Sequence, residues 1–250
     1  MMDSGPPAGF ARDSQFSPTR WSLVAAAGDP DAAQPRQALG ELCKAYWYPL
    51  YAYLRRARHS EADAGDLLQG FFLKLFETDG LRTADRSRGR FRSFLLASLK
   101  HHVANEQRRE QAQKRGGGQP PISLDLSRGE SRYANEAIEP ADSLTPDMFY
   151  DRQWAVALLE QVMTKLGSEH NATGKADLFD ALSAHLAGES DADYASIGAR
   201  LGMTEGAVKV AAHRLRARWR ESLRAEIAET LAEGESVDDE LCNLFNAFGS

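Results

Sequence analysis

Hydrophobic residues recur at helical spacing along most of the chain, and the alternating pattern of a β-strand is nearly absent. Towards the C-terminal end, Tyr194, Ile197 and Leu201 follow each other at intervals of three and four, so one helix can turn all three towards a core. A second helical run follows, and its predicted buried face carries Ala207, Val208, Ala211 and Leu215. The pattern therefore predicts two consecutive helices in this part of the chain.

The residues between these two helices predict a tight turn. Gly202 stands where the first helix ends, and glycine adopts the left-handed conformation of such an end at little steric cost. Thr204 follows as a predicted N-cap, with Glu205 beside the positive end of the helix dipole. The predicted exposed face of the second helix carries Lys209, His213, Arg214, Arg216, Arg218 and Arg220. This combination is typical of a DNA-binding helix-turn-helix, whereas a basic face alone would indicate only a solvated surface.

Helices are also predicted in the N-terminal part of the chain. Pro49 is expected to kink or divide the first long helix there. Ser60 and Asp63 resemble a capping box, and the helix that they start carries Leu67, Leu68, Phe71, Phe72, Leu75 and Phe76. After a polar loop at residues 78–90, a further helix carries Phe91, Phe94, Leu95, Leu99 and Val103. Their helical spacing favours a core role for these phenylalanines.

Glycine and proline mark a boundary between the helical units. The stretch GGGQPP at residues 116–121 is not followed by Gly-Lys-Ser/Thr, so a linker is favoured over a phosphate-binding loop. The predicted fold class is all-α, with two small helical domains on a flexible linker, a helix-turn-helix ending the second, and an acidic C-terminal extension. The predicted segments are a disordered N-terminus (1–18), a first domain (19–115), the linker (116–147), a second domain (148–225) and the extension (226–250).

Charge is segregated along the chain, which changes the meaning of its net charge of −6. Residues 82–115 contain ten Lys and Arg against three Asp and Glu, and residues 205–224 contain six against two. Residues 225–250 contain seven acidic residues and no Lys or Arg. Because local fields steer nucleic acid, two basic islands in an acidic protein are compatible with DNA binding.

Other classes of protein are disfavoured by what the sequence lacks. Cys43 and Cys242 form no C-x-x-C pair, so neither a disulfide framework nor a zinc site is predicted. No apolar run approaches the roughly 20 residues that span a bilayer, and the N-terminus has no secretory pattern, so we expect a cytoplasmic protein without membrane insertion. The adjacent His101 and His102 face different directions on a helix and predict no metal site. No cofactor and no catalytic residue is predicted.

The two helical units together resemble a bacterial RNA polymerase sigma factor of the extracytoplasmic-function type, in the sigma-70 family, over residues 19–224. The helix of this family that docks on the clamp of core RNA polymerase is similar to DAGDLLQGFFLKLFE, which starts at Asp63. The helix that opens and reads the −10 element is similar to FRSFLLASLKHHVANEQRRE, which starts at Phe91. The helix-turn-helix that reads the −35 element is similar to YASIGARLGMTEGAVKVAAHRLRARWR, which starts at Tyr194.

The resemblance implies three groups of site residues. Recognition of the −35 element is assigned to Thr204, Glu205, Lys209, His213, Arg214, Arg216 and Arg218. Capture of the unpaired −10 strand is assigned to Arg90, Arg92, Lys100, His101, Asn105, Arg108 and Arg109, with a base pocket in the loop at residues 78–90. Docking on polymerase is assigned to Asp63, Asp66, Leu67, Gln69, Phe72 and Lys74. Unpaired bases need apolar pockets beside a basic groove, which agrees with the second group.

Two places depart from the family pattern. Gly70 stands where an acidic residue commonly follows the glutamine, so part of the charge complementarity to polymerase is missing. Val210 and Ala211 stand where many relatives have Ser-Arg. Direct base contacts are therefore expected from Glu205, Lys209, His213 and Arg214, whereas Arg216 and Arg218 would contact phosphates.

The acidic extension predicts an amphipathic helix, because its apolar residues have helical spacing: Leu241, Leu244, Phe245 and Phe248. Packing of this helix on the second domain is the simpler interpretation. Autoregulation is the alternative, in which the acidic side chains compete with DNA for the basic recognition helix. Deletion of residues 234–250 would then raise promoter affinity.

The resemblance implies a sigma factor that binds core RNA polymerase and directs it to promoter DNA, both as duplex and as unpaired −10 strand. It allows for an anti-sigma factor as a further partner. The alternative is a stand-alone helix-turn-helix regulator that binds duplex DNA without polymerase. A nuclease or hydrolase is disfavoured because the sequential Asp238, Asp239 and Glu240 cannot all face one metal ion. A scaffold would lack the steep salt dependence of phosphate contacts.

Overall fold

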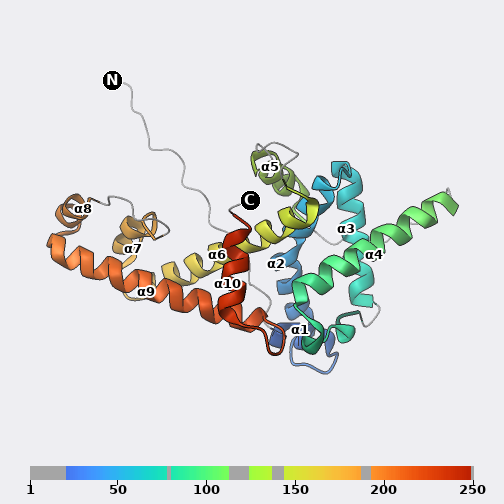
Figure 1. The fold of residues 1–250 in the computed structure, drawn as a ribbon, viewed down its shortest axis with the longest axis horizontal. Helices are drawn as coiled ribbons and strands as arrows, with labels where there is room; N and C mark the ends of the chain where they lie inside the picture. The colour runs from blue at the N-terminus through green and yellow to red at the C-terminus, as the bar shows by residue number, and fades with distance from the viewer. Residues whose placement is uncertain (1–20, 78–79, 113–123, 137–143, 187–192, 249–250) are drawn as a thin grey trace, which may run out of the picture.

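The structure, a computed structural model, describes residues 21–77, 80–112, 124–136, 144–186 and 193–248. The described residues form ten α-helices and two 3-10 helices without any strand, so the predicted all-α class is confirmed. The helices are α1 (Trp21–Gly28), α2 (Pro35–Arg56), α3 (Glu61–Glu77), η1 (Gly80–Thr83), η2 (Arg86–Arg88), α4 (Phe91–Ala112), α5 (Leu126–Glu136), α6 (Pro146–Ala172), α7 (Ala176–Ser183), α8 (Tyr194–Leu201), α9 (Glu205–Thr230) and α10 (Val237–Asn246). The molecule is elongated, with α8 at one end and the C-terminal end of α4 at the other (Figure 1).

Helices α2 and α3 follow from local sequence signals, with one exception. Of the two outcomes expected at Pro49, a kink or a division, the division is contradicted, because α2 is one helix of 22 residues with Pro49 inside it. The neighbouring Tyr48 and Leu50 are buried, and this packing offsets the hydrogen bond that proline cannot donate. The predicted cap of α3 is present: Ser60 Oγ accepts a hydrogen bond from the Asp63 amide at 3.1 Å.

Part of the segment predicted as a linker is a packed helix. Helix α5 lies against α2, where Arg55 donates to the Glu130 carboxylate from Nε at 2.8 Å and from Nη2 at 2.7 Å. The Tyr51 hydroxyl donates to the same carboxylate at 2.6 Å. The prediction of a flexible linker is therefore wrong for residues 124–136, because a bidentate ion pair fixes this stretch on α2.

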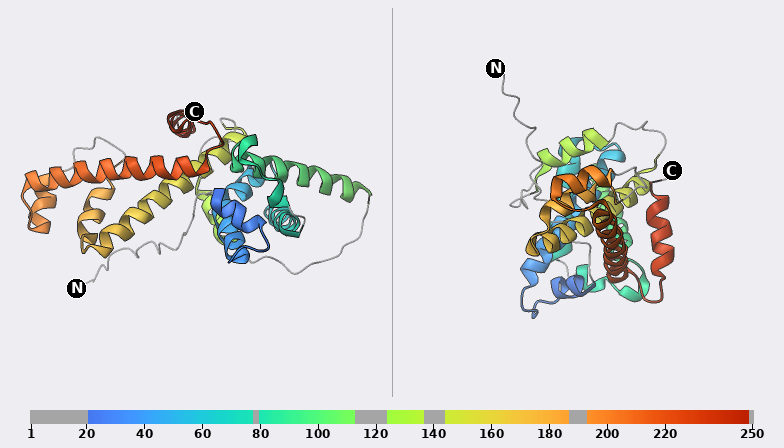
Figure 2. Two further views of the ribbon diagram at one scale, coloured as in Figure 1. Left: turned by 90° about the horizontal axis from the view of Figure 1, so that it is seen from below. Right: turned by 90° about the vertical axis from the view of Figure 1, so that its left-hand side faces the viewer.

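Helix α6 connects the N-terminal half of the molecule, formed by α1 to α5, with the C-terminal half, formed by α7 to α10. Its first half packs on α2, and the buried Tyr150 donates from its hydroxyl to the Arg92 backbone carbonyl of α4 at 3.0 Å. Its second half runs beside α9 and buries Val162 and Leu166 (Figure 2). Most buried hydrophobic residues consequently form one cluster that extends from α1 to α10, and a small second cluster contains Tyr48, Ala52, Leu144 and Phe149. The division into two domains stays a prediction, but the core continues across the predicted boundary.

The two helices predicted at residues 194–220 are present as α8 and α9, and a tight turn joins them. Gly202 has the left-handed conformation with φ 66°, and Thr204 Oγ1 accepts from the Ala207 amide at 3.2 Å, as predicted. Burial differs in one respect, because Ala207 is exposed and Ala212 is buried instead. The inner face of α9 thus begins at Val208 and continues through Ala212. The assignment of this helix pair as a DNA-binding helix-turn-helix stays a prediction.

Substitution of Gly198 by alanine is expected to destabilise the α8–α9 turn. A Cβ atom at Gly198 would lie 2.6 Å from the Met203 carbonyl oxygen, so the backbone must move. Because such overpacking typically costs about 1–3 kcal/mol, urea unfolding should show Gly198→Ala to be less stable by that amount. Gly206→Ala is the matched control, since its Cβ would meet nothing within 4 Å. Equal stability of the two variants would contradict the prediction.

The C-terminal segment folds back over the molecule. Helix α9 continues to Thr230, beyond the predicted domain end, and a turn with Gly234 at φ 81° leads into α10. The Leu231 carbonyl accepts from the Trp21 indole at 3.1 Å and from Arg86 Nε at 3.0 Å. Helix α10 then lies against α6 and α9. The segment therefore contacts both halves of the molecule, and not the second alone.

Candidate nucleic-acid interface

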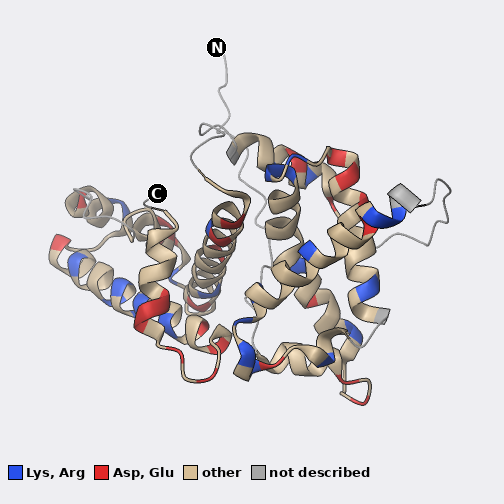
Figure 3. Ribbon diagram, turned by 45° about the vertical axis from the view of Figure 1, so that its right-hand side comes forward, with Lys and Arg blue, Asp and Glu red and all other residues tan. Residues whose placement is uncertain are grey.

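Lys and Arg residues recur along helix α9 (Figure 3), and all of them except Arg216 are exposed, on what is here called the outer face of the helix. Lys209 Nζ pairs with Glu205 one turn earlier at 2.6 Å, and this hydrogen bond raises the pKa of Lys209. His213 and Arg214 are exposed, and Arg214 has no ion-pair partner among the described residues. Val210 adds an apolar side chain that is 51% exposed. This face offers charged, hydrogen-bonding and apolar groups to a partner, as base edges in a major groove require.

Two arginines predicted to contact phosphates bond to other residues of the protein. Arg216 is half-buried and donates from Nη2 to the Tyr194 hydroxyl at 3.1 Å and to the His185 carbonyl at 3.3 Å. Arg218 pairs with Glu169 of α6 at 3.1 Å and with Glu221 at 3.0 Å. Arg216 therefore fixes α9 to α8 and to the end of α7, and a phosphate would have to replace these bonds at either residue.

A hollow of about 210 Å³ opens between α3, η1 and α4. Its lining combines aromatic, aliphatic and polar side chains: Phe71, Lys74, Leu75, Gly80, Thr83, Phe94, Ser98, His101, His102 and Asn105. The predicted loop pocket thus corresponds in part to this hollow, because the loop contributes Gly80 and Thr83 whereas α3 and α4 contribute the rest. Residues 78–79 of that loop lie outside the described residues. Aromatic walls with several polar groups suit an unpaired base.

His102 belongs to this hollow, although sequence reasoning treated it as an ordinary polar residue. Its side chain is buried, its ring lies 6.0 Å from that of Phe71, and its Nδ1 atom has no hydrogen-bond partner among the described residues. Burial lowers the pKa of His102, which favours the neutral ring at neutral pH. Its spacing of three from Leu99 and seven from Leu95 places it on the apolar face of α4, and this signal predicts its burial.

Arg90 and Arg92, both predicted to capture the −10 strand, are covered by the C-terminal segment. Arg92 is 8% exposed; its guanidinium lies 4.0 Å from the centre of the Trp154 ring and binds Glu240. Arg90 pairs with Glu240 at 2.5 Å and with Glu235 at 2.9 Å. In the described conformation these two side chains are therefore not available to DNA, because carboxylates occupy both guanidinium groups, and their contact with the −10 strand stays a prediction.

The remaining residues of the predicted −10 group lie exposed along α4. His101 and Asn105 border the hollow, and Arg108 and Arg109 follow on the next turn. Lys100 is bound to Asp147 of α6, and this hydrogen bond raises the pKa of Lys100. Four of these five side chains therefore extend from the hollow along α4, and Arg109 among them pairs with Glu106 at 3.0 Å.

The residues assigned to polymerase docking all lie on α3, with unequal exposure. Asp63, Asp66 and Lys74 are exposed, and Leu67 and Gln69 are half-buried. Phe72 is 1% exposed, so its assignment to an interface is wrong: it belongs to the core. The sequence placed Phe72 on the apolar face of its helix, and that face turns inward.

The described part of the chain lacks a candidate metal site and a membrane-spanning helix. No group of three or more His, Cys, Asp or Glu residues there could hold a metal ion. Within the same residues, no helix combines the length and the apolar character needed to cross a membrane. Comparison of the chain with protein-family models, with curated proteins and with solved structures found no match.

Proposed function

We propose that this protein is a sigma factor of the extracytoplasmic-function type, which binds core RNA polymerase and directs promoter recognition and transcription initiation. The observation that carries the proposal is that α9, with its exposed basic residues, and the hollow beside α4 lie in opposite halves of one molecule (Figure 1). The outer face of α9 suits a DNA major groove, and the hollow beside α4 suits an unpaired base. Promoter opening requires both kinds of surface in one protein.

Helix α9 would read the −35 duplex through its outer face. Lys209 and Arg214 can donate to guanine O6 and N7, and the Val210 methyl groups can contact a thymine methyl group. Glu205 orients Lys209 through their ion pair, so the two side chains would act together. Thr204 caps the helix, and its role would be to fix the N-terminal turn that enters the groove.

Helix α4 would hold the unpaired −10 strand. Phe71 and Phe94 supply aromatic walls for one base, while His101 and Asn105 supply hydrogen-bonding groups at its edge. Arg108 and the neighbouring Arg109 would then follow the phosphate backbone away from the hollow. Helix α3 shares a wall of this hollow and carries the exposed charges proposed to dock on polymerase, so strand capture would occur beside the polymerase contact.

The function is tested by titrating the purified protein with bacterial core RNA polymerase and by run-off transcription on a pool of genomic promoters. Saturable binding together with new start sites would support the proposal. Absence of core binding, combined with salt-sensitive binding to duplex DNA, would overturn it. That result would leave the alternative, a stand-alone regulator that binds duplex DNA. The burial of Arg92 under α10 favours this alternative, because it removes one strand-capture residue.

Replacement of His101 and Asn105 together by alanine is expected to weaken binding to unpaired DNA and to leave duplex binding unchanged. Loss of two polar contacts to one base should lower affinity for a forked −10 oligonucleotide about tenfold, a change within the range of about 1–3 kcal/mol for a base contact. Fluorescence anisotropy of forked and fully paired oligonucleotides measures both affinities. Equal weakening on the two DNAs would indicate a general effect on folding or charge, and would contradict the assignment of the hollow.

A further inference from the structure

Glu240 of α10 is buried between two arginines that come from the other half of the chain. Its side chain has 0% exposure. One carboxylate oxygen, Oε2, lies 2.5 Å from Arg90 Nη1 and 3.2 Å from Asn243 Nδ2, and the other binds Arg92. Glu235 binds Arg90 from the preceding turn at 2.9 Å. Two carboxylates of the C-terminal segment therefore occupy two guanidinium groups at the start of α4.

The site that receives Glu240 is organised to hold an anion. Trp154 supports the Arg92 guanidinium from one side, and the Tyr150 hydroxyl holds the Arg92 backbone carbonyl. Asp151 is 3.4 Å from Arg92 Nε and is exposed, so a second carboxylate lies at the rim of the site. A buried carboxylate is costly unless it is fully paired, which explains why Glu240 takes two guanidinium groups. Arginine binds carboxylate and phosphate oxygens with the same planar geometry.

Charge contributes much of the contact that holds α10 in place. Of its apolar residues, Leu244 is buried and Val237 and Leu241 are half-buried against the core, whereas Phe245 is 52% exposed. A further ion pair of the helix joins Asp238 to Arg224 of α9 at 2.5 Å, ten residues beyond Arg214. The acidic segment thus does not touch the outer face of α9 that was predicted to be its target. It covers the start of α4 instead.

We propose that residues 232–248 form an intramolecular competitor for nucleic acid, in which Glu235 and Glu240 occupy the place of DNA phosphates on Arg90 and Arg92. Displacement of α10 then exposes both guanidinium groups at the end of α4 that leads towards the hollow. The ligand of the uncovered site is a phosphate of single-stranded DNA, and this identification rests on the proposed function. The competitor lowers the apparent affinity of this site for DNA, because DNA must displace two carboxylates before it binds.

The test uses the full chain and a fluorescein-labelled single-stranded oligothymidylate, with anisotropy measured over a range of salt concentrations. Glu235→Gln together with Glu240→Gln removes both charges while it retains side-chain size. We expect this variant to bind at least about fivefold more tightly, with a salt slope steeper by about 0.7 for each additional phosphate that the protein neutralises. Addition of Arg90→Ala and Arg92→Ala should abolish this increase in affinity. Thermal unfolding of each variant confirms that it is folded.

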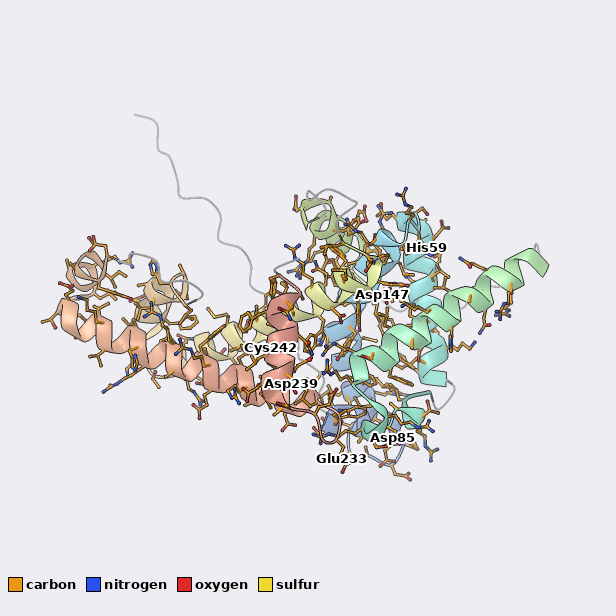
Figure 4. All side chains as sticks on the ribbon, in the orientation of Figure 1. His59, Asp85, Asp147, Glu233, Asp239 and Cys242 are labelled. Atoms are coloured by element: carbon orange, nitrogen blue, oxygen red, sulfur yellow. The ribbon has the colours of Figure 1, made fainter. Side chains whose placement is uncertain are left out.

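Asp239→Asn provides the matched control, because Asp239 is exposed on the same helix (Figure 4). It removes one negative charge without touching either arginine, so its affinity should stay within twofold of the parent protein, as expected for a screened surface charge. If Asp239→Asn and the double glutamine variant bind equally, the higher affinity is a general charge effect and the competitor is overturned. The competitor is also overturned if the higher affinity survives replacement of both arginines.

A second measurement follows α10 in the unsubstituted protein. Cys242 is exposed on α10, whereas burial raises the pKa of the Cys43 thiol to about 12, so a maleimide dye at neutral pH labels Cys242 selectively. Saturating oligothymidylate should increase the mobility of the dye as α10 leaves its site. If saturating oligothymidylate leaves the mobility of the dye unchanged, the proposal is overturned. Release of α10 without any binding of core polymerase would instead retain the competitor and remove the sigma-factor function.

Discussion

Replacement of Phe72 by alanine will lower the free energy of unfolding by about 3–5 kcal/mol. Phe72 lies in the core of the N-terminal half. The centre of its ring is 5.8 Å from that of Phe76, on which it stacks, and 5.5 Å from that of Phe71. Its removal leaves a cavity that the surrounding helices cannot close. Urea unfolding, with the slope of free energy against denaturant unchanged, measures this loss.

Asp66→Ala separates this core role from a role in docking. Asp66 is exposed on the same helix, so its replacement should change the free energy of unfolding by no more than about 0.5 kcal/mol. If α3 docks on core polymerase, Asp66→Ala should nevertheless weaken that binding. A Phe72→Ala protein as stable as its parent, but unable to bind polymerase, would return Phe72 to the interface and contradict its place in the core.

Replacement of Lys209 and Arg214 together by alanine will weaken binding to a −35 duplex by about 1.5 to 4 orders of magnitude. Each side chain is expected to contribute about 1–3 kcal/mol if it contacts a base edge, and removal of each phosphate contact lowers the salt slope by about 0.9. Both side chains are exposed on the outer face of α9, away from its core contacts. Anisotropy titrations at several salt concentrations measure affinity and slope together.

Lys44→Ala controls for net charge in that experiment. Lys44 is exposed on α2, in the other half of the molecule, so its loss should change duplex affinity less than twofold. If the doubly substituted protein binds as tightly as the Lys44→Ala protein, α9 is not the helix that reads DNA. A change in affinity without discrimination between cognate and scrambled duplex would assign both residues to phosphates only.

Local signals predicted two helix boundaries correctly, because neighbouring residues determine them. Gly202 and Thr204 mark the turn between α8 and α9, and Ser60 caps α3, as the sequence indicates. Helical spacing also identified most of the core. The spacing was wrong about Ala207, which is exposed, and about Ala212, which is buried although it was not predicted to be. The exact direction of a helix face depends on the helix against which it packs.

Contacts between distant segments could not be predicted in this way. Arg92 and Glu240 are 148 residues apart, and nothing near either residue indicates that they meet. Helix α5 was missed for the same reason, since this polar stretch is held on α2 by contacts with residues distant in the sequence, among them the ion pair of Glu130 with Arg55. Phe72 was assigned wrongly although the local signal was sufficient. Its apolar spacing indicated the core, where it lies, whereas the resemblance implied a contact surface.

The shared position of α6 has a consequence for protein engineering. Its first half belongs to the packing of α2, while its second half supports the helix pair α8–α9. Chimeras that exchange the C-terminal half for that of another protein would therefore split a single packed unit if they were joined within residues 137–143. A junction near the middle of α6, between Ala157 and Val162, would preserve the surface that α2 requires. Reprogramming of the DNA-reading helix is best done by substitution on its outer face, with the scaffold beneath it left intact.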